Sequence, residues 1–339
     1  MSLRDVRILR FAFGTGLSVA LAYGLEYPVS FLSTVLAAAF LGTPAPSPGA
    51  RALATIEASI AASFAVGIVM SLVLVPSPLV YFLALSLLLF RIFHASMGGA
   101  SPFIVLMALI GVILIPVLGT QSTTLAVDVA ADFFWAATIG FAWVAIAHAV
   151  LPDPGFTSAS PAPADPTILP DEERYRAALA MVALVLPLAM AIVLLQWSDQ
   201  ITTLLYVAIL SMRPTALRAG AGMVVGSLIG GSAALVVYVL TSIHHSWLFL
   251  VLLVLWILLM LGRRIFSEGP RAALFAGAPA AFLILISSTN SAFGEETETK
   301  LLMRLISIVL ATSYLVIGQR LLSSLATWRG RRQSEEASA

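Results

Sequence analysis

Long apolar stretches follow one another along almost the whole chain, and they limit the folds that it can adopt. A transmembrane helix needs about 20 predominantly apolar residues. On that measure the sequence predicts twelve spans, near 7–25, 28–43, 50–75, 78–94, 101–119, 122–151, 175–196, 199–213, 215–241, 246–262, 271–289 and 300–327. We therefore predict an all-α integral membrane protein embedded in a lipid bilayer.

The composition agrees with this prediction. Of 339 residues, 60% are hydrophobic and 10% are charged, whereas a soluble domain carries about 25% charged residues. The mean hydropathy is +1.01. A net charge of +1 excludes an electrostatic nucleic-acid binder.

The sequence contains no motif of a known catalytic class. It has no cysteine, so it has neither a disulfide framework nor thiolate chemistry. It also lacks a G-x-S-x-G, an H-E-x-x-H and a Walker A sequence. We expect no enzyme activity, no cofactor and no metal site.

Lysine and arginine mark the cytoplasmic side of a membrane protein. If the spans alternate from a cytoplasmic N-terminus, all of the 18 basic residues except Lys300 and Arg304 fall on that side. Both termini are therefore predicted to be cytoplasmic. The predicted parts are a six-helix repeat, a Pro/Ala-rich cytoplasmic linker, a second six-helix repeat and a cytoplasmic tail, at residues 1–151, 152–174, 175–328 and 329–339.

The two halves share positions in the sequence. Arg91-Ile92-Phe93 recurs as Arg264-Ile265-Phe266, at the end of the fourth span of each half. Basic and small residues of the third and ninth spans correspond at one constant offset in residue number. Arg51, Ser59, Ser63 and Gly67 correspond, in that order, to Arg218, Gly226, Gly230 and Ala234. Because six spans is an even number, these are predicted to be parallel repeats about an axis along the membrane normal.

A short, broken apolar segment occurs in both halves. The second span, Pro28 to Gly42, ends in a proline-rich turn that contains Pro44, and the eighth ends in Met212-Arg213-Pro214. Such paired segments point to a transporter's binding site. The small residues Ser59, Ser63, Gly226 and Gly230 allow close helix packing, and they could also line a path beside it.

Glu57 lies about 9 Å into the third span at 1.5 Å per residue. A charge at such depth costs about 2.5–3.5 kcal/mol, so it usually faces a partner or a wet cavity. Its counterpart in the second half is Val224, so the repeat itself does not require a charge. Glu57 is either a proton-coupling group or the partner of Arg51 or Arg91.

Asp128 and Asp132 are the second pair of acidic candidates. They share one face of the sixth span, and two neighbouring carboxylates suit proton binding because they resist ionising together. Arg304 lies at roughly the corresponding depth of the twelfth span. It either forms a structural salt bridge with one aspartate or attracts an anionic substrate, whose carboxylate a guanidinium binds bidentately.

The remaining candidates lie near the predicted membrane boundaries. Arg91 and Arg213 could meet an anion, although positive-inside anchoring explains Arg213 adequately. His94 and His148 are expected to be solvated. Trp197 is expected in the aromatic belt at the outer interface.

The arrangement resembles the fusaric-acid-resistance and aromatic-acid-exporter superfamily. The similarity rests on six spans, a linker and six spans, on the opening Arg7-Ile-Leu-Arg10-Phe-Ala-Phe-Gly, and on the proline-rich turn from Gly42 to Arg51. The resemblance implies a proton-driven efflux protein of the bacterial inner membrane that works with a periplasmic membrane-fusion protein. The larger exporters carry a soluble cytoplasmic domain after each half, for which this sequence leaves no room.

Three functions remain open from the sequence. The first is a secondary exporter of small aromatic or amphipathic organic acids, in which Glu57, Asp128 and Asp132 handle protons and Arg304 attracts the anion. The second is a passive channel or a scaffold subunit of an envelope assembly, which the low charge content fits equally well. A membrane-embedded enzyme would need His94 or His148 in a convergent acid site. A homo-oligomer is compatible with all three.

Overall fold

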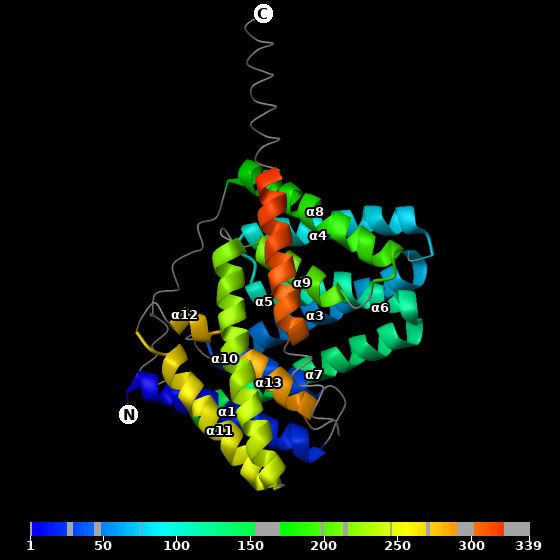
Figure 1. Cartoon of the computed structure of the whole chain (residues 1–339). Coiled ribbons are helices and arrows are strands. Elements are labelled where there is room, and N and C mark those ends of the chain that lie inside the picture. Colours follow the sequence, from blue (N-terminus) through cyan, green and yellow to red (C-terminus); the bar gives the residue numbers. More distant parts are fainter. Residues whose placement is uncertain are drawn as a thin grey trace, which may run out of the picture. The chain divides into compact units, whose positions relative to one another are not determined.

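The structure of the chain is a computed structural model, and it is helical throughout the part that it describes (Figure 1). The described residues are 2–25, 30–43, 49–74, 76–152, 170–197, 200–212, 216–244, 246–268, 272–289 and 302–321. Within them, nine helices are long and apolar enough to cross a membrane. The predicted all-α integral membrane protein is confirmed.

The helices of the first half follow the predicted spans closely. They are α1 (Leu3–Leu25), α2 (Ser30–Leu41), α3 (Ala50–Val69) with the π-helical segment η1 (Met70–Leu74), α4 (Pro78–Met97), α5 (Pro102–Leu109), η2 (Ile110–Leu114), α6 (Ile115–Gln121) and α7 (Thr123–Val150). The predicted fifth span is thus one helical stretch with a π-helical interior. Pro116 explains the wider turn, because its ring would clash with the carbonyl four residues earlier in a regular α-helix.

The second half repeats this series. Its helices are α8 (Asp171–Leu194), α9 (Ile201–Ser211), α10 (Ala216–Ile243), α11 (Trp247–Ile265), α12 (Ala272–Phe275), α13 (Ala278–Thr289) and a last helix, Leu302–Leu321. The single span predicted at 271–289 is wrong, because the chain turns at Ala276–Gly277 and divides the segment into α12 and α13. The apolar helices of the second and eighth spans are short, as predicted.

The described residues group into two compact units, each of which takes segments from both halves of the chain. The first unit comprises Met1–Ala61, Asp128–Ala164 and Ala221–Leu305. In it α1 packs on α2 and α11, and α2 packs on α13. Its core contains the buried side chains of Phe11, Leu41, Val144, Leu258 and Phe282.

The second unit comprises Ala62–Val127, Asp165–Gly220 and Ile306–Ala339. In it α8 packs on α9 and α4, and α9 packs on α5 and η2. Since α8 and α9 are the first two helices of the second half, these contacts repeat those of α1 and α2 in the first unit. Each unit therefore combines the first two helices of one half with the fourth and fifth of the other, which supports the internal repeat. The predicted linker and tail lie almost entirely outside the described residues.

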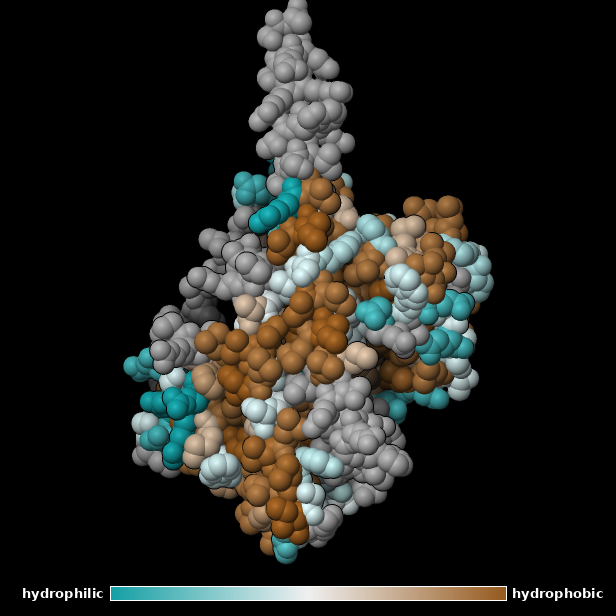
Figure 2. Space-filling view, viewed as in Figure 1, coloured by the Kyte–Doolittle hydropathy of each residue, from teal (hydrophilic) through white to brown (hydrophobic). Residues whose placement is uncertain are grey.

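The fourth helix of each half presents an apolar stripe to its surroundings. Leu79, Leu83 and Leu87 of α4 are 76%, 63% and 62% exposed, and Leu248, Leu252 and Trp256 of α11 are 58%, 57% and 54% exposed. Figure 2 shows hydrophobic side chains over much of the visible surface of the helices. Removing apolar surface from water is favourable by roughly 25 cal/mol per Å². Contact of these stripes with lipid is therefore more favourable than contact with water.

Small residues set the closest helix contacts inside each unit. A Cβ atom built on Gly230 of α10 would overlap the Ala278 carbonyl oxygen and lie 2.8 Å from the Ala281 Cβ. A Cβ atom on Gly111 of η2 would lie 2.6 Å from the Ser63 carbonyl oxygen of α3. Ser63 and Gly230, two of the positions predicted to allow close helix packing, lie at these contacts.

Candidate functional site

Four of the charged side chains within the apolar helices belong to the first unit. Glu57 on α3, Asp128 and Asp132 on α7, and Arg304 on the last helix all belong to it. Burying a charge in a membrane helix is costly, and such residues usually mark a path or a partner. We therefore define the candidate site by these four residues.

Glu57 is half-buried and contacts a hydroxyl group of another span. Thr138 Oγ1 on α7 forms a short hydrogen bond with Glu57 Oε1. Within the described part of the first unit, Glu57 makes no ion pair with Arg51, whose side chain is exposed. The carboxyl group is thus paired with a neutral hydroxyl that joins α3 to α7.

Thr138 Oγ1 also lies 3.0 Å from the carbonyl oxygen of Phe134, one turn earlier on α7. A hydroxyl group has one hydrogen and two lone pairs, so it donates to one of these two oxygens at a time. When Glu57 is ionised, the hydroxyl hydrogen is needed by the carboxylate. When Glu57 is protonated, the carboxyl O–H can donate to Thr138, and the Thr138 hydrogen can turn to Phe134.

Asp128 and Asp132 lie one turn apart on α7, as predicted. Asp128 is exposed and Asp132 is half-buried. Among the described residues, neither forms an ion pair with Arg304. The structural salt bridge considered for Arg304 is therefore not formed here.

Arg304 contacts a serine instead. Its Nε donates a hydrogen bond to Ser227 Oγ at 3.3 Å, and Ser227 on α10 is 3% exposed. In the part of the chain described, both terminal Nη groups of Arg304 are without a hydrogen-bond acceptor. A guanidinium with both of these groups available can bind a carboxylate bidentately.

The two polar contacts occupy corresponding places in the repeat. Glu57 and Thr138 join the third and sixth spans of the first half, and Ser227 and Arg304 join the third and sixth spans of the second half. In the first pair the charged residue lies on the third span, whereas in the second it lies on the sixth. Thr138 and Ser227 could not be predicted from the sequence, because a hydroxyl group in an apolar helix carries no signal of its partner.

The surroundings of four of the residues predicted to pack helices or to line a pathway are described. Ser59 is half-buried and donates to the Thr55 carbonyl oxygen of its own helix at 2.8 Å, and Ser63 is half-buried against Gly111. Gly226 and Gly230 are buried against the junction of α12 and α13. Pro44, Pro214 and Arg213 lie outside the described residues.

Two residues near the predicted cytoplasmic boundary are buried rather than solvated. Arg10 is 1% exposed, and its Nη1 donates to the Leu151 carbonyl oxygen at 3.2 Å, at the C-terminal end of α7. A cation there also stabilises the negative end of the helix dipole. His148, expected in solvent, is buried with Nδ1 at 2.9 Å from the Val144 carbonyl oxygen. Arg91 is exposed on α4, and His94 is half-buried beside Phe90.

One family model matches part of the chain. The model of a family described as "Protein of unknown function (DUF2955)" matches residues 7–148. This range runs from α1 to the end of α7, so the matched region is one six-helix half. No curated protein and no solved structure matches the chain significantly. The family description names no activity, and the resemblance to the exporter superfamily stays a prediction.

Proposed function

We propose that this protein is a proton-coupled secondary transporter that exports small aromatic or amphipathic organic acids across the bacterial inner membrane, together with a periplasmic membrane-fusion protein. One observation supports it most: the half-buried Glu57 carboxyl, inside a membrane helix, is hydrogen-bonded to Thr138 of another span. A structural ion pair would hold the carboxylate ionised, whereas a hydroxyl partner can serve both of its protonation states.

The Glu57–Thr138 contact would couple proton binding to helix packing. A hydrogen bond to a charged group contributes about 1.5–3 kcal/mol, and one between neutral groups about 0.5–1.5 kcal/mol. Protonation of Glu57 would therefore weaken the link between α3 and α7 by about 1 kcal/mol. Asp128 and Asp132, on the same helix as Thr138, would offer further proton-binding groups.

Arg304 would supply the attraction for an organic anion. Its Nε is held by Ser227, which fixes the plane of the guanidinium. The two Nη groups can then receive both oxygens of one carboxylate or sulfonate. Arg91, whose side chain is exposed, and Arg213 are further anion candidates.

Uptake into everted membrane vesicles tests the proton coupling. Benzenesulfonate is a suitable probe because it stays ionised and carries no proton through the lipid by itself. An acidic vesicle lumen should drive its accumulation by the wild-type protein, and Glu57→Gln should lose this dependence on the pH gradient. Unchanged gradient-driven uptake by Glu57→Gln and by Asp128→Asn/Asp132→Asn would sink the proton assignment.

Variants of Thr138 sharpen the test. Thr138→Val keeps the shape of the side chain but removes the donor to the Glu57 carboxyl group, so the pH profile of uptake should change. Thr138→Ser should keep the wild-type profile. Thr55→Val is the matched control, because the exposed Thr55 hydroxyl donates only to its own helix, at the Arg51 carbonyl oxygen.

Counterflow separates a carrier from a passive channel. A carrier loaded with unlabelled benzenesulfonate on one side should show faster and saturable uptake of the labelled anion from the other. A flux that rises linearly with concentration and ignores the trans anion would indicate the channel.

A further inference from the structure

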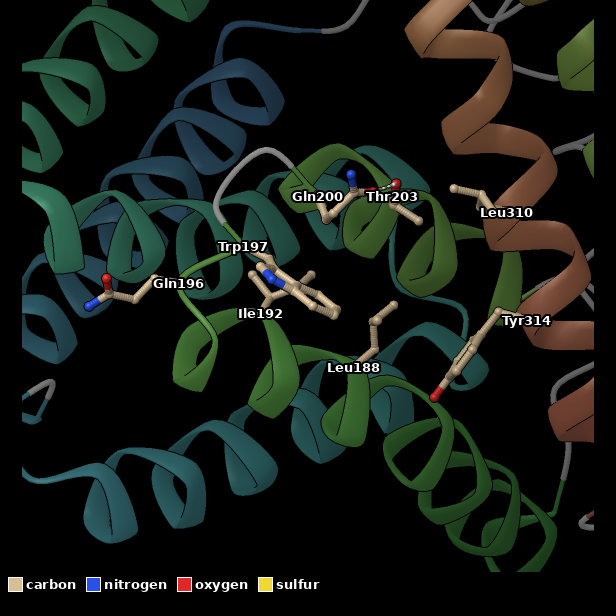
Figure 3. A pocket seen from close by; sticks show the side chains of 8 residues that line it. All are labelled: Leu188, Ile192, Gln196, Trp197, Gln200, Thr203, Leu310 and Tyr314. Atoms are coloured by element: carbon tan, nitrogen blue, oxygen red, sulfur yellow. Dashed lines mark hydrogen bonds between the residues drawn. The ribbon is translucent and has the colours of Figure 1, made fainter.

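A cavity of about 550 Å³ lies in the second unit, apart from the residues discussed so far. Figure 3 shows its lining, which comes from the end of α8, the start of α9 and the last helix. Most of the lining is apolar or aromatic, and the lining residues are Leu188, Ile192, Gln196, Trp197, Gln200, Thr203, Leu310 and Tyr314. Its volume is in the range of small-molecule sites, about 300–1,000 Å³.

The C-terminal end of α8 holds the aromatic side of the cavity in place. The backbone N–H of Trp197 donates to the Ile192 carbonyl oxygen at 2.9 Å, and the backbone N–H of Gln196 donates to the Val193 carbonyl oxygen at 3.4 Å. Gln196 has a φ of 54°, which lies in the left-handed region. This is a Schellman motif, in which the residue after the left-handed position packs back on the last helical turn. Trp197 is thereby placed beside Ile192 at the cavity wall.

Tyr314 closes the opposite side. Its hydroxyl donates to the Leu184 carbonyl oxygen of α8 at 2.8 Å. The hydroxyl hydrogen is therefore used within the protein, and the ring is fixed between the last helix and α8. In Figure 3, Leu188 lies between Trp197 and Tyr314.

A polar pair lies next to the aromatic wall. Thr203, which is 6% exposed, donates from Oγ1 to Gln200 Oε1 at 3.0 Å (Figure 3). This bond occupies the amide oxygen of Gln200 and leaves its NH₂ group, with two hydrogens, to donate elsewhere. The Gln196 side chain extends away from the other lining residues in Figure 3.

We propose that this cavity binds an uncharged, ring-bearing amphiphile whose carbonyl, ester or amide oxygen accepts a hydrogen bond from the Gln200 NH₂ group. The ring would stack on Trp197, since aromatic pairs contribute beyond the area they bury. None of the eight lining residues is charged, so an anion would lose hydration here without gaining a counter-charge. The ligand class thus differs from the anions proposed for the first unit.

Direct binding in nanodiscs, without a pH gradient, tests this site separately from proton-coupled transport. The probe is tritiated methyl 4-hydroxybenzoate, compared with the ring-matched anion 4-hydroxybenzoate and with the aliphatic ester methyl cyclohexanecarboxylate. The wild-type protein should bind the aromatic ester saturably, and both comparison compounds at least tenfold more weakly. Trp197→Ala should weaken binding of the aromatic ester at least tenfold. Gln200→Leu should weaken it about two- to tenfold, as expected for one neutral hydrogen bond.

Trp247→Ala is the matched control, because Trp247 is an exposed tryptophan of the first unit and is not among the residues that line the cavity. Its affinity should equal that of the wild type. Gln200 is exposed, so Gln200→Leu remains informative even if Trp197→Ala does not fold. Equal affinity of the aromatic and aliphatic esters, as for a groove that takes lipid chains, would overturn the proposal. So would wild-type affinity in both Trp197→Ala and Gln200→Leu.

Discussion

Two glycines of α10, one turn apart, should respond to the same substitution with opposite signs. A Cβ atom on Gly230 would overlap the Ala278 carbonyl oxygen and lie 2.8 Å from both the Ala281 Cβ and the Phe282 nitrogen. These are mostly backbone atoms, which cannot move aside locally. A Cβ atom on Gly226 would meet its nearest neighbours at 3.4 Å, an ordinary van der Waals distance.

The magnitudes follow from two opposing effects. Alanine is favoured over glycine in a helix interior by about 0.8–1.0 kcal/mol, and overpacking costs about 1–3 kcal/mol. Gly226→Ala should therefore stabilise the protein by about 0.5–1 kcal/mol. Gly230→Ala should destabilise it by about 1–2 kcal/mol.

Unfolding in mixed micelles, followed by circular dichroism as the fraction of denaturing detergent rises, measures both changes against the wild type. We predict that Gly226→Ala is more stable than the wild type and that Gly230→Ala is less stable. Destabilisation by Gly226→Ala, or wild-type stability of Gly230→Ala, would refute the packing of α10 on α12 and α13 described above.

Three further predictions concern other contacts. Arg10→Met should destabilise the protein by about 1–3 kcal/mol in the same assay, because it removes a buried side chain and its hydrogen bond to the carbonyl oxygen of the half-buried Leu151. Exposed Arg4→Met should change stability by less than about 0.5 kcal/mol. Gln196→Gly should raise stability by about 0.5–1 kcal/mol, since relief of the left-handed strain exceeds the added freedom of the unfolded chain. Arg304→Lys keeps the charge but loses the paired N–H groups of the guanidinium. The KM for benzenesulfonate in vesicle uptake should therefore rise about tenfold, with a smaller change in kcat. An unchanged KM would show that Arg304 does not bind the anion.

The sequence predicts the helices well because long apolar runs have few alternatives in lipid. Its errors fall where the backbone departs from a regular helix. The break at Gly277 and the π-helical turn before Pro116 depend on local packing that hydropathy alone does not report. Arg91-Ile92-Phe93 and Arg264-Ile265-Phe266 predict a repeat, but they do not predict that each compact unit contains helices from both halves.

The candidate site was predictable only in its charges. Glu57, Asp128, Asp132 and Arg304 stand out because each is costly in an apolar helix. Their partners do not, since Thr138 and Ser227 are ordinary residues in membrane helices until the fold brings them to a charged group. Arg10 resembles other arginines at a cytoplasmic helix end, and only the three-dimensional packing shows that it is buried.

The central claim is that Glu57 binds and releases a proton beside Thr138. Infrared difference spectra of the reconstituted protein between acidic and alkaline pH measure this directly, through the C=O stretch of a protonated carboxyl group. A band that is absent in Glu57→Gln, shifted in Thr138→Val and unchanged in Thr138→Ser is the predicted result. If no band in the spectrum depends on Glu57 over the pH range in which the protein stays folded, the account is contradicted.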